Sequence, residues 1–299
     1  MKPNEHEYKL MGLAPYGRRK YFEKPLNVFK KTLYVDGTKF KWKIKPTDSY
    51  FWFKDRLEGT RFDNIASGLQ TWVEELLVKW VKNWIKKTKI NKVVLSGGVA
   101  LNIKAMGKIA EIKELKDMFI GGSASDDTLS IGAAFCLAED LTNKKSKRWD
   151  SKNFFPIPNL YLGPISNSKS EKKSLKKLNK KKYVIKKNFS NETIAKFLSE
   201  GKILARCAGR MEFGQRALGN RSILADPSNP FTKQKINSAI KSRDFWMPFA
   251  PVILDKCSHK YIINEKKIIS KFMTIGFNVT KEGAKKIIAA THPADKTAR

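Results

Sequence analysis

The sequence has few cysteines and no long apolar run, and each shortage excludes a class of protein. Its three cysteines are widely spaced and odd in number, so they form neither a disulfide framework nor a zinc-binding pattern. No run of about 18 uncharged apolar residues is present, and no apolar segment follows the charged first residues. We therefore expect neither a membrane span nor a secretory signal, and the reduced cysteines favour the cytoplasm.

The chain does contain enough apolar residues for a folded core. Its 299 residues are 41% hydrophobic, with 7 Trp and 18 Phe, and this composition is typical of a folded protein with two domains. Residues 144–168 hold three prolines and interrupt the regular patterns. We place a boundary there, with one domain at residues 1–155 and a second at residues 156–299.

Positive charge is in large excess. The formal net charge is +32, and the densest run of lysines lies between Lys169 and Lys187. Nucleic-acid surfaces usually combine arginine and aromatic residues with lysine, whereas this run has no arginine and one tyrosine. Leu175 and Leu178 are spaced as on one face of a helix. We interpret the run as a solvated surface, and a nucleic acid is not expected as a partner.

Arginine, in contrast, is scarce and clustered. The chain has 49 Lys and 11 Arg. Five of the arginines fall within 38 residues: Arg206, Arg210, Arg216, Arg221 and Arg243. A planar guanidinium group binds carboxylate or phosphate through two parallel hydrogen bonds, which an ammonium group cannot do. Because this chain uses lysine for most positive charges, the cluster predicts an anion-binding site.

Apolar patterns predict alternating helices and strands. Residues 62–90 repeat apolar side chains every three or four positions, as a long amphipathic helix does. Two short apolar strands follow, within 92–98 and 117–122, and each leads through a turn into a helix. Further strands are expected within 183–187 and 202–208, and a last one ending at Leu254. This order predicts an α/β fold, in which ligands bind at the carboxyl ends of strands.

The turns after the first two strands carry residues suited to ligand binding. Gly97 and Gly98 would let backbone amides approach a phosphate, although such turns also serve only to reverse the chain. Asp126 and Asp127 precede the next helix, where one carboxylate can cap the helix and one can hold a cation. The residues alone leave these alternatives open.

The stretch Gly209–Pro227, GRMEFGQRALGNRSILADP, contains a glycine every five residues. Gly209, Gly214 and Gly219 are too frequent for a helix interior and predict a tightly turned backbone. The arginines between them would repel one another unless an anion lies among them. Phosphate groups are therefore the favoured occupant.

Structural ion pairs are the alternative for these arginines. Glu212 and Asp226 are the acidic residues within the stretch, and two carboxylates cannot pair three or more guanidinium groups through two bonds each. A separate polar cluster ends the chain, with a histidine, an aspartate, a threonine and an arginine in eight residues, and its role is not evident from its composition.

Six segments together resemble one family, the NodU/CmcH-type O-carbamoyltransferases. They follow the order of the family along the whole chain, and Gly209–Pro227 is the most specific of them. The segments are EYKLMGLAPYG (Glu7–Gly17), VVLSGGVALN (Val93–Asn102), SASDDTLSIGAA (Ser123–Ala134), GRMEFGQRALGNRSILADP (Gly209–Pro227), KSRDFWMPFAPVIL (Lys241–Leu254) and THPADKTAR (Thr291–Arg299).

This resemblance implies a fold and a reaction. The first module would be the C-terminal part of an actin-like ATPase (ribonuclease H-like) domain, and the second a YrdC-like α/β domain. The YrdC-like domain would make carbamoyl adenylate from ATP and carbamoyl phosphate, and the first module would transfer the carbamoyl group to a hydroxyl group. The implied cofactors are ATP with Mg²⁺, carbamoyl phosphate as co-substrate, and Fe²⁺ or another divalent metal.

Residue roles follow from the same resemblance. The residues implied in catalysis are Arg216, Arg221, Lys241, Arg243 and His292. The residues implied in nucleotide and phosphate binding are Gly97, Gly98, Asn102, Arg210, Ser222, Asp295, Thr297 and Arg299. Asp126 would bind the metal, which would act on the carbamoyl carbonyl as a Lewis acid.

The chain departs from the family pattern at three points. The family metal also needs a His-x-x-x-His pair upstream of Glu7, which this chain lacks. We therefore expect a fragment with incomplete transfer activity, and a short homologue is the alternative. Gln215 stands where the family has proline. Lys296 stands where the family has glycine, and a positive φ at that position would strain a lysine.

We thus expect a cytoplasmic O-carbamoyltransferase whose partner is a small hydroxylated acceptor, such as a sugar, a polyketide or a lipochitooligosaccharide. A homodimer stays open, and a membrane is not expected. Two alternatives remain. One is a tRNA-binding or tRNA-modifying protein of the threonylcarbamoyl type, suggested by the net charge. The other is a nucleotide-binding remnant without catalysis.

Overall fold

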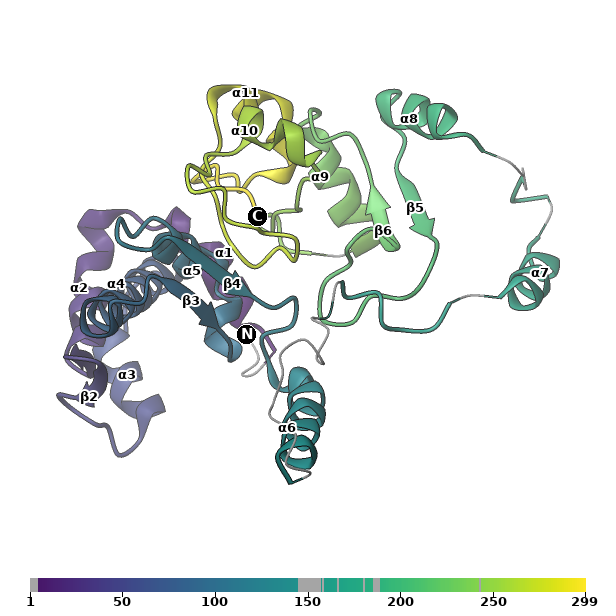
Figure 1. The fold of residues 1–299 in the computed structure, drawn as a ribbon. Coiled ribbons are helices and arrows are strands. Elements are labelled where there is room, and N and C mark those ends of the chain that lie inside the picture. Colours follow the sequence, from purple (N-terminus) through teal and green to yellow (C-terminus); the bar gives the residue numbers. More distant parts are fainter. Residues whose placement is uncertain are drawn as a thin grey trace.

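The computed structural model describes residues 5–144, 157, 159–165, 167–179, 181–184, 189–241 and 243–299. It confirms the α/β class, because the chain combines helices with small two-stranded sheets (Figure 1). The boundary predicted near residue 155 falls outside the described residues and stays a prediction.

The first half of the chain is organised around α4, which confirms the long amphipathic helix predicted there. Trp72 and Trp80 of α4 donate indole N–H groups to the carbonyl oxygens of Leu33 and Thr38, at 3.2 and 3.0 Å, and so fasten the β1–β2 hairpin to the helix. The elements of this half are α1 (Glu7–Leu13), η1 (Ala14–Tyr16), α2 (Arg19–Lys30), β1 (Leu33–Asp36), β2 (Lys39–Trp42), α3 (Ser49–Leu57), α4 (Phe62–Thr88), β3 (Lys92–Leu95), η2 (Gly98–Leu101), α5 (Ile103–Ala110), β4 (Asp117–Ile120), η3 (Asp126–Thr128) and α6 (Leu129–Lys144).

The two predicted apolar strands form a parallel pair. β3 and β4 are in register from Lys92 opposite Asp117 to Leu95 opposite Ile120, and α5 connects them. Because the carboxyl ends of parallel strands meet at one edge of a sheet, the turns that follow β3 and β4 lie at the same edge. This arrangement confirms the predicted rhythm of strand, turn and helix.

The second half contains shorter elements. Its bounds are α7 (Ser168–Lys176), α8 (Asn191–Ser199), β5 (Leu204–Cys207), β6 (Arg221–Leu224), α9 (Phe231–Ile236), the π-helical turn η5 (Asn237–Lys241), η6 (Asp255–Cys257), α10 (Ser258–Tyr261), α11 (Lys281–Lys286) and η7 (Ile288–Ala290). β5 confirms the strand predicted within 202–208 and pairs antiparallel with β6. Ser190 caps α8 by accepting the N–H of Thr193 at 3.2 Å.

One predicted strand is wrong and another is largely outside the described residues. Residues 248–254 have no regular secondary structure and pair with no strand of the described chain. Pro248 and Pro251 lack the backbone N–H groups that a central strand would donate, which accounts for the difference. Of the strand predicted within 183–187, residues 185–187 are not described, and Tyr183 and Val184 are not in a strand.

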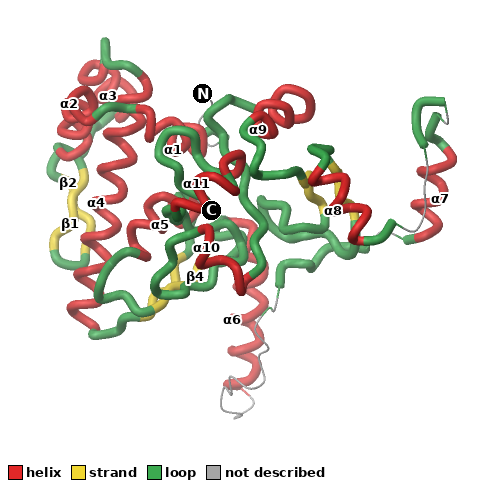
Figure 2. Tube along the Cα trace, turned by 90° about the horizontal axis from the view of Figure 1, so that it is seen from above, coloured by secondary structure: helices red, strands yellow, loops and turns green. Residues whose placement is uncertain are grey.

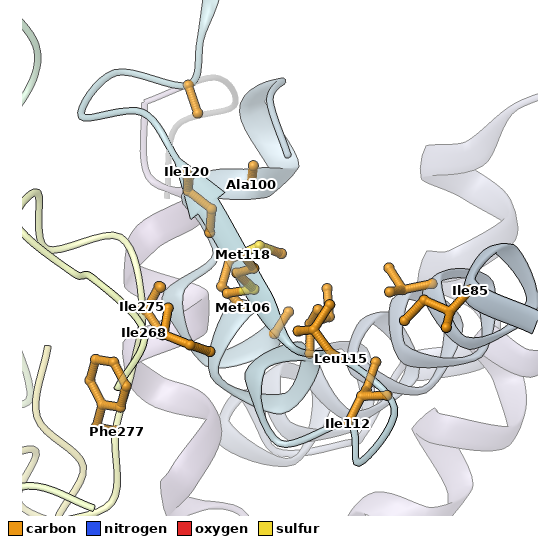
Figure 3. Close-up of a cluster of buried hydrophobic side chains, with 14 residues drawn as sticks. Ile85, Ala100, Met106, Ile112, Leu115, Met118, Ile120, Ile268, Ile275 and Phe277 are labelled. Atoms are coloured by element: carbon orange, nitrogen blue, oxygen red, sulfur yellow. The ribbon is translucent and has the colours of Figure 1, made fainter. Parts of the chain in front are cut away.

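The end of the chain packs into the core of the first half. Ile268, Ile275 and Phe277 join the buried cluster of α4, α5 and β4 (Figure 3). Gly276 donates its N–H to the carbonyl oxygen of Ile103 at 2.8 Å, and a Cβ on Gly107 would lie 2.4 Å from the Gly276 carbonyl oxygen. Only glycine at position 107 permits this approach, so both halves of the chain contribute to one core.

Two helices stand apart from this core. Both views show α6 projecting from the body and α7 lying far from the other helices (Figures 1 and 2). Every residue from 169 to 179 is exposed, and the interpretation of this part of the lysine run as a solvated surface without a partner stays a prediction. None of the described helices is long and apolar enough to cross a membrane.

Candidate functional site

A cavity of about 2900 Å³ is lined by residues of both halves of the chain. It brings together residues that the sequence placed in separate segments. From the first half these are Gly98, Asn102 and Asp126, and from the second half Arg216, Arg221, Ser222, Arg243 and Arg299. The remaining predicted site residues lie elsewhere or have side chains outside the described ones.

Three of the arginines on the cavity wall lie close together without an acidic partner among the described residues. Burial, followed by the charges of Arg216 and Arg243, lowers the pKa of Arg299 to about 9. Burial also lowers the pKa of Arg216. The Nε atoms of Arg216 and Arg299 are shielded from solvent and have no hydrogen-bond partner. Among the described arginines, the one that forms an ion pair is Arg61, with Asp63.

Unpaired, partly desolvated guanidinium groups are unfavourable in a free protein. An anion with several oxygens in the cavity could accept hydrogen bonds from the terminal nitrogens of these guanidinium groups and would offset the repulsion among the three positive charges. The group of Arg216, Arg243 and Arg299 is therefore suited to binding an anion, although Arg299 was not in the cluster that the composition indicated, and the anion site stays a prediction.

The loop that carries Arg216 is tightly turned, as its glycines predicted. Gly209, Gly214 and Gly219 have φ of 58°, 97° and 114°, a region that favours glycine. These glycines fold the segment back on itself, so that β6 runs antiparallel beside β5.

The acidic residues of this loop do not pair with its arginines, so the alternative of structural ion pairs is wrong for the described residues. Oε1 of Glu212 accepts the backbone N–H groups of Leu218, Asn220 and Arg221 at 3.1, 2.6 and 3.1 Å. Burial alone would raise the pKa of Glu212, but backbone hydrogen bonds outweigh it and lower the pKa. Asp226 accepts hydrogen bonds from Ser228.

Arg221 and Ser222 bind backbone groups at the loop itself, whereas Arg210 binds the earlier residue Leu162. The Arg221 guanidinium donates to the carbonyl oxygens of Ala208 and Gly209 at 2.7 and 3.3 Å, although the residue also lines the cavity. Ser222 Oγ accepts the N–H of Gly219 at 2.9 Å. Arg210 donates to the carbonyl oxygen of Leu162 at 3.1 Å and is not among the cavity residues. These contacts shape the loop in which Arg216 is held.

Lys241 and Arg243 flank the end of η5. Lys241 is the last residue of this turn, and its side chain lies outside the described ones. The guanidinium carbon of Arg243 lies 5.9 Å from the ring centre of Phe249, and both residues line the cavity. The pairing of Lys241 and Arg243 as a phosphate grip stays a prediction.

The turn after β3 contributes Gly98 and Asn102 to the cavity, and whether its glycines bind phosphate stays a prediction. Gly97 has φ of 100° and does not line the cavity, whereas Gly98 does. Asn102 caps α5 by accepting the N–H of Ala105 at 3.1 Å, and its side-chain amide exchanges two hydrogen bonds with that of Gln70, at 3.0 and 2.9 Å. Gln70 also lines the cavity and was not predicted, because nothing in the helical pattern of α4 distinguishes it.

The two aspartates of the turn after β4 have different surroundings. Asp127 accepts hydrogen bonds from Ser123 Oγ at 2.5 Å and from Ser125 Oγ at 2.9 Å, and the Ser123 bond is the main cause of its lowered pKa. Asp126 is exposed and lines the cavity. Within the described ranges no three His, Cys, Asp or Glu side chains come together as a metal site would require. The described residues therefore do not fit a metal held by a set of protein ligands at Asp126.

The final polar cluster lies behind the cavity, except for its last residue. His292 is 4% exposed, and its Nε2 donates to the carbonyl oxygen of Gly12 at 2.7 Å. Asp295 forms an ion pair with Lys104 and accepts the hydroxyl of Thr297 at 2.8 Å. His292, Asp295 and Thr297 do not line the cavity, whereas Arg299 does. The catalytic and binding roles predicted for His292, Asp295 and Thr297 stay predictions. The sequence did not indicate that Lys104 would pair with Asp295.

Lys296, between Asp295 and Thr297, has φ of 60°. This value confirms that the position has the conformation that favours glycine. The lysine at this position is therefore strained, as its place in the segment predicted.

Comparison with known proteins identifies the family. Residues 1–135 match the family model described as Carbamoyltransferase N-terminus, and residues 195–299 match that described as Carbamoyltransferase C-terminus. All the described residues on the cavity wall named above fall within one of these two ranges.

Curated relatives agree with these matches. The chain is 32% identical to an uncharacterized protein of Methanocaldococcus jannaschii, over 99% of the chain and 48% of the relative. It is 27% identical to Nodulation protein NolO of Bradyrhizobium diazoefficiens, over 98% of the chain and 53% of the relative. It is 28% identical to Nodulation protein U of Azorhizobium caulinodans, over 64% of the chain and 31% of the relative.

The chain thus spans about half the length of the first two of these relatives. The N-terminal and C-terminal family models both match the chain, in that order along the sequence, and the two matched ranges contain the cavity residues named above. We conclude that the chain belongs to the NodU/CmcH-type carbamoyltransferase family of transferase enzymes.

Proposed function

We propose that this chain binds ATP and carbamoyl phosphate at the arginine cluster and forms carbamoyl adenylate, as the activating part of an O-carbamoyltransferase. The observation that carries the proposal is the group of Arg216, Arg243 and Arg299, which face one cavity without acidic partners in the described chain. A triphosphate together with an acyl phosphate presents many anionic oxygens, which matches three adjacent guanidinium groups.

The chemistry assigned to these arginines is electrostatic. In the proposed reaction water first cleaves carbamoyl phosphate into carbamate and inorganic phosphate. A carbamate oxygen then bonds to the α-phosphorus of ATP while the bond from that phosphorus to the leaving pyrophosphate breaks, and negative charge develops on the phosphate oxygens. Fixed guanidinium groups stabilise that charge without having to reorganise, and the partly buried position of Arg216 and Arg299 strengthens the effect. Because these guanidinium groups are partly desolvated, a charged hydrogen bond to a phosphate oxygen gains more than it would at an exposed arginine.

The opposite wall would receive the adenylate for transfer. Gly98 and Asp126 lie on this wall, at the edge where β3 and β4 end. Mg²⁺ accompanying ATP needs only one or two protein carboxylates beside the phosphates, so Asp126 is the ligand that we propose for it. Mg²⁺ would neutralise phosphate charge there. A hydroxylated small molecule is the proposed acceptor, and no step is assigned to a transition metal, because the described residues do not fit one.

The experiment that tests adenylation is exchange of labelled pyrophosphate into ATP, measured with and without carbamoyl phosphate. We expect exchange that depends on carbamoyl phosphate. Arg216→Lys and Arg299→Lys should each lower it about 10- to 100-fold, because lysine keeps the charge and loses the second parallel bond. Arg19→Lys is the matched control, since Arg19 is exposed at the start of α2 and does not line the cavity.

Two results would contradict the proposal. One is a folded protein without exchange at saturating ATP and carbamoyl phosphate. The other is exchange that the Arg216→Lys and Arg299→Lys variants retain at the level of Arg19→Lys. The first result would show that the protein does not form carbamoyl adenylate. The second would show that Arg216 and Arg299 take no part in adenylation.

A further inference from the structure

Gln215 connects the arginine loop to the turn that carries Asp126. Its Nε2 donates to Ser125 Oγ at 3.0 Å, across a separation of 90 residues in the chain. Gln215 and Ser125 both line the cavity, and Arg216 is the next residue after Gln215. The bond therefore joins the segment that carries Arg216 to the turn that carries Asp126.

The backbone before Gln215 is also seated on this turn. A Cβ on Gly214 would lie 3.2 Å from Ser123 Cβ and 3.3 Å from the Gly122 carbonyl oxygen. Gly214 has φ of 97°, so both the space and the conformation require glycine. Two consecutive residues before Arg216 are thus fixed to residues 122–125.

Asp127 sets the direction of the Gln215 bond. Ser125 Oγ donates its one hydrogen to Asp127 Oδ1 at 2.9 Å, so a lone pair remains for Gln215 Nε2. Ser123 Oγ donates to the same carboxylate at 2.5 Å. The chain of hydrogen bonds therefore runs from Gln215 through Ser125 to Asp127, and leaves the adjacent Asp126 facing the cavity.

Arg216 depends on such anchoring, because its guanidinium has no described hydrogen bond of its own. Its Nε is shielded and without a partner. After Arg216, the loop is fixed by Glu212, which accepts the N–H of Leu218 at 3.1 Å. Arg216 lies between these two attachments, so its position in the cavity is determined by the backbone around it.

We propose that Gln215 is a positioning residue, which through Ser125 and Asp127 holds Arg216 at a fixed place beside the turn that carries Asp126. This inference rests on the proposed function for what Arg216 binds, and on the hydrogen bonds alone for how Arg216 is held. Removing the amide leaves the loop folded, since Glu212 and Gly214 still fix its two sides, but lets Arg216 move. Anion affinity then falls and the arginine becomes more reactive.

The test is a double-mutant cycle with Gln215→Ala, Ser125→Ala and both together. One measurement is calorimetric affinity for inorganic pyrophosphate. We expect each single variant to bind roughly five- to tenfold more weakly, and the double variant to bind no more weakly than the singles, because both remove the same bond. The matched control is Gln234→Ala, since Gln234 is exposed on α9 and does not line the cavity.

A second measurement needs no ligand. Phenylglyoxal reacts with accessible arginine, and mass spectrometry gives its rate at Arg216 in the free protein. We expect a faster reaction at Arg216 in all three variants and an unchanged rate in Gln234→Ala. Melting temperatures within about 2 °C of the parent chain would show that the variants are folded.

The outcomes separate the two proposals. If the parent chain does not bind pyrophosphate but the variants react faster at Arg216, the anion function is wrong and the positioning role stands. If both Arg216 labelling and pyrophosphate affinity match those of Gln234→Ala, the positioning role is wrong. Strictly additive effects of Gln215→Ala and Ser125→Ala on labelling would also overturn it, because the two residues would then not act through one bond.

Discussion

His292 Nε2 lies 2.7 Å from the carbonyl oxygen of Gly12, 280 residues earlier in the chain. Ala294 donates its N–H to the other ring nitrogen at 3.2 Å, so Nδ1 carries no proton and Nε2 does. Burial is the main cause of a lowered pKa for His292, which agrees with a neutral ring. This pair holds the end of the chain against α1, behind the wall that contains Arg299.

We expect His292→Phe to destabilise the protein by about 2–3 kcal/mol. Phenylalanine keeps the ring volume but leaves the buried carbonyl oxygen of Gly12 without a donor. Urea unfolding measures the change. The matched control is His259→Phe, because His259 is exposed and has no described hydrogen bond, and it should stay within about 0.5 kcal/mol of the parent chain. A small effect at His292 would show that the Gly12 contact contributes little.

The same histidine predicts a pH dependence of stability. Its pKa is about 6.5 in the unfolded chain and lower when folded, so the unfolded state binds a proton first as the pH falls. The contribution of the neutral ring is complete above about pH 6.5 and is lost as the pH falls toward the folded pKa. Unfolding free energies at pH 7.5 and 5.5 should differ less in His292→Phe than in the parent chain. An equal difference would assign the dependence to other groups.

Lys296→Gly should stabilise the protein by about 0.5–1 kcal/mol. Lys296 has φ of 60°, where a side chain costs about 1–2 kcal/mol, and the greater freedom of glycine in the unfolded chain offsets part of the gain. Thermal and urea unfolding measure the change. Lys286→Gly is the control and should lower the stability, because Lys286 is the last residue of the helix α11 and glycine is unfavourable in a helix. If both variants lose stability, the backbone at Lys296 is not strained.

Glu212→Gln should lower stability by about 1–2 kcal/mol and speed amide hydrogen exchange at Asn220 and Arg221. Glutamine keeps one acceptor oxygen for the three backbone amides but removes the charge that strengthens their bonds. Glu23→Gln, at an exposed residue of α2, is the control. Unchanged exchange at Asn220 would mean that the glycines alone fix the loop.

The parts of the fold that the sequence predicted are those set by local patterns. The spacing of apolar residues in Phe62–Thr88 is sufficient to define α4, and the recurring glycines of the arginine loop are sufficient to predict its positive φ values. The failed strand before Leu254 shows the limit of this reasoning. An apolar segment pairs only if a neighbour offers hydrogen bonds, and Pro248 and Pro251 remove two of its own.

Positions of side chains around the cavity depend on contacts between distant segments. Arg210 and Arg216 belong to one stretch, yet Arg210 binds Leu162 and Arg216 lines the cavity. The difference arises because Gly214 is seated on Ser123, some 90 residues earlier, and no local pattern encodes that approach. In the same way, the sequence placed His292 and Arg299 together, whereas the pairing with Gly12 buries one and leaves the other on the cavity wall.

Arg299→Met should raise the stability of the ligand-free protein and abolish its response to pyrophosphate. Methionine replaces a shielded cation, whose Nε has no partner and whose pKa is lowered to about 9, with an apolar chain of similar length. Pyrophosphate at about 100 times its dissociation constant should stabilise the parent chain by about 2.7 kcal/mol, which is several degrees in melting temperature. Thermal unfolding with and without the anion measures both effects.

The control for this substitution is Arg19→Met, at an exposed arginine away from the cavity, which should keep the pyrophosphate response. A structural role for Arg299 predicts the reverse pattern, in which the free protein loses stability and the anion response persists. The combination of gained stability and lost response is therefore specific to an arginine that is kept unpaired for a ligand, because only such a residue is unfavourable until its anion binds.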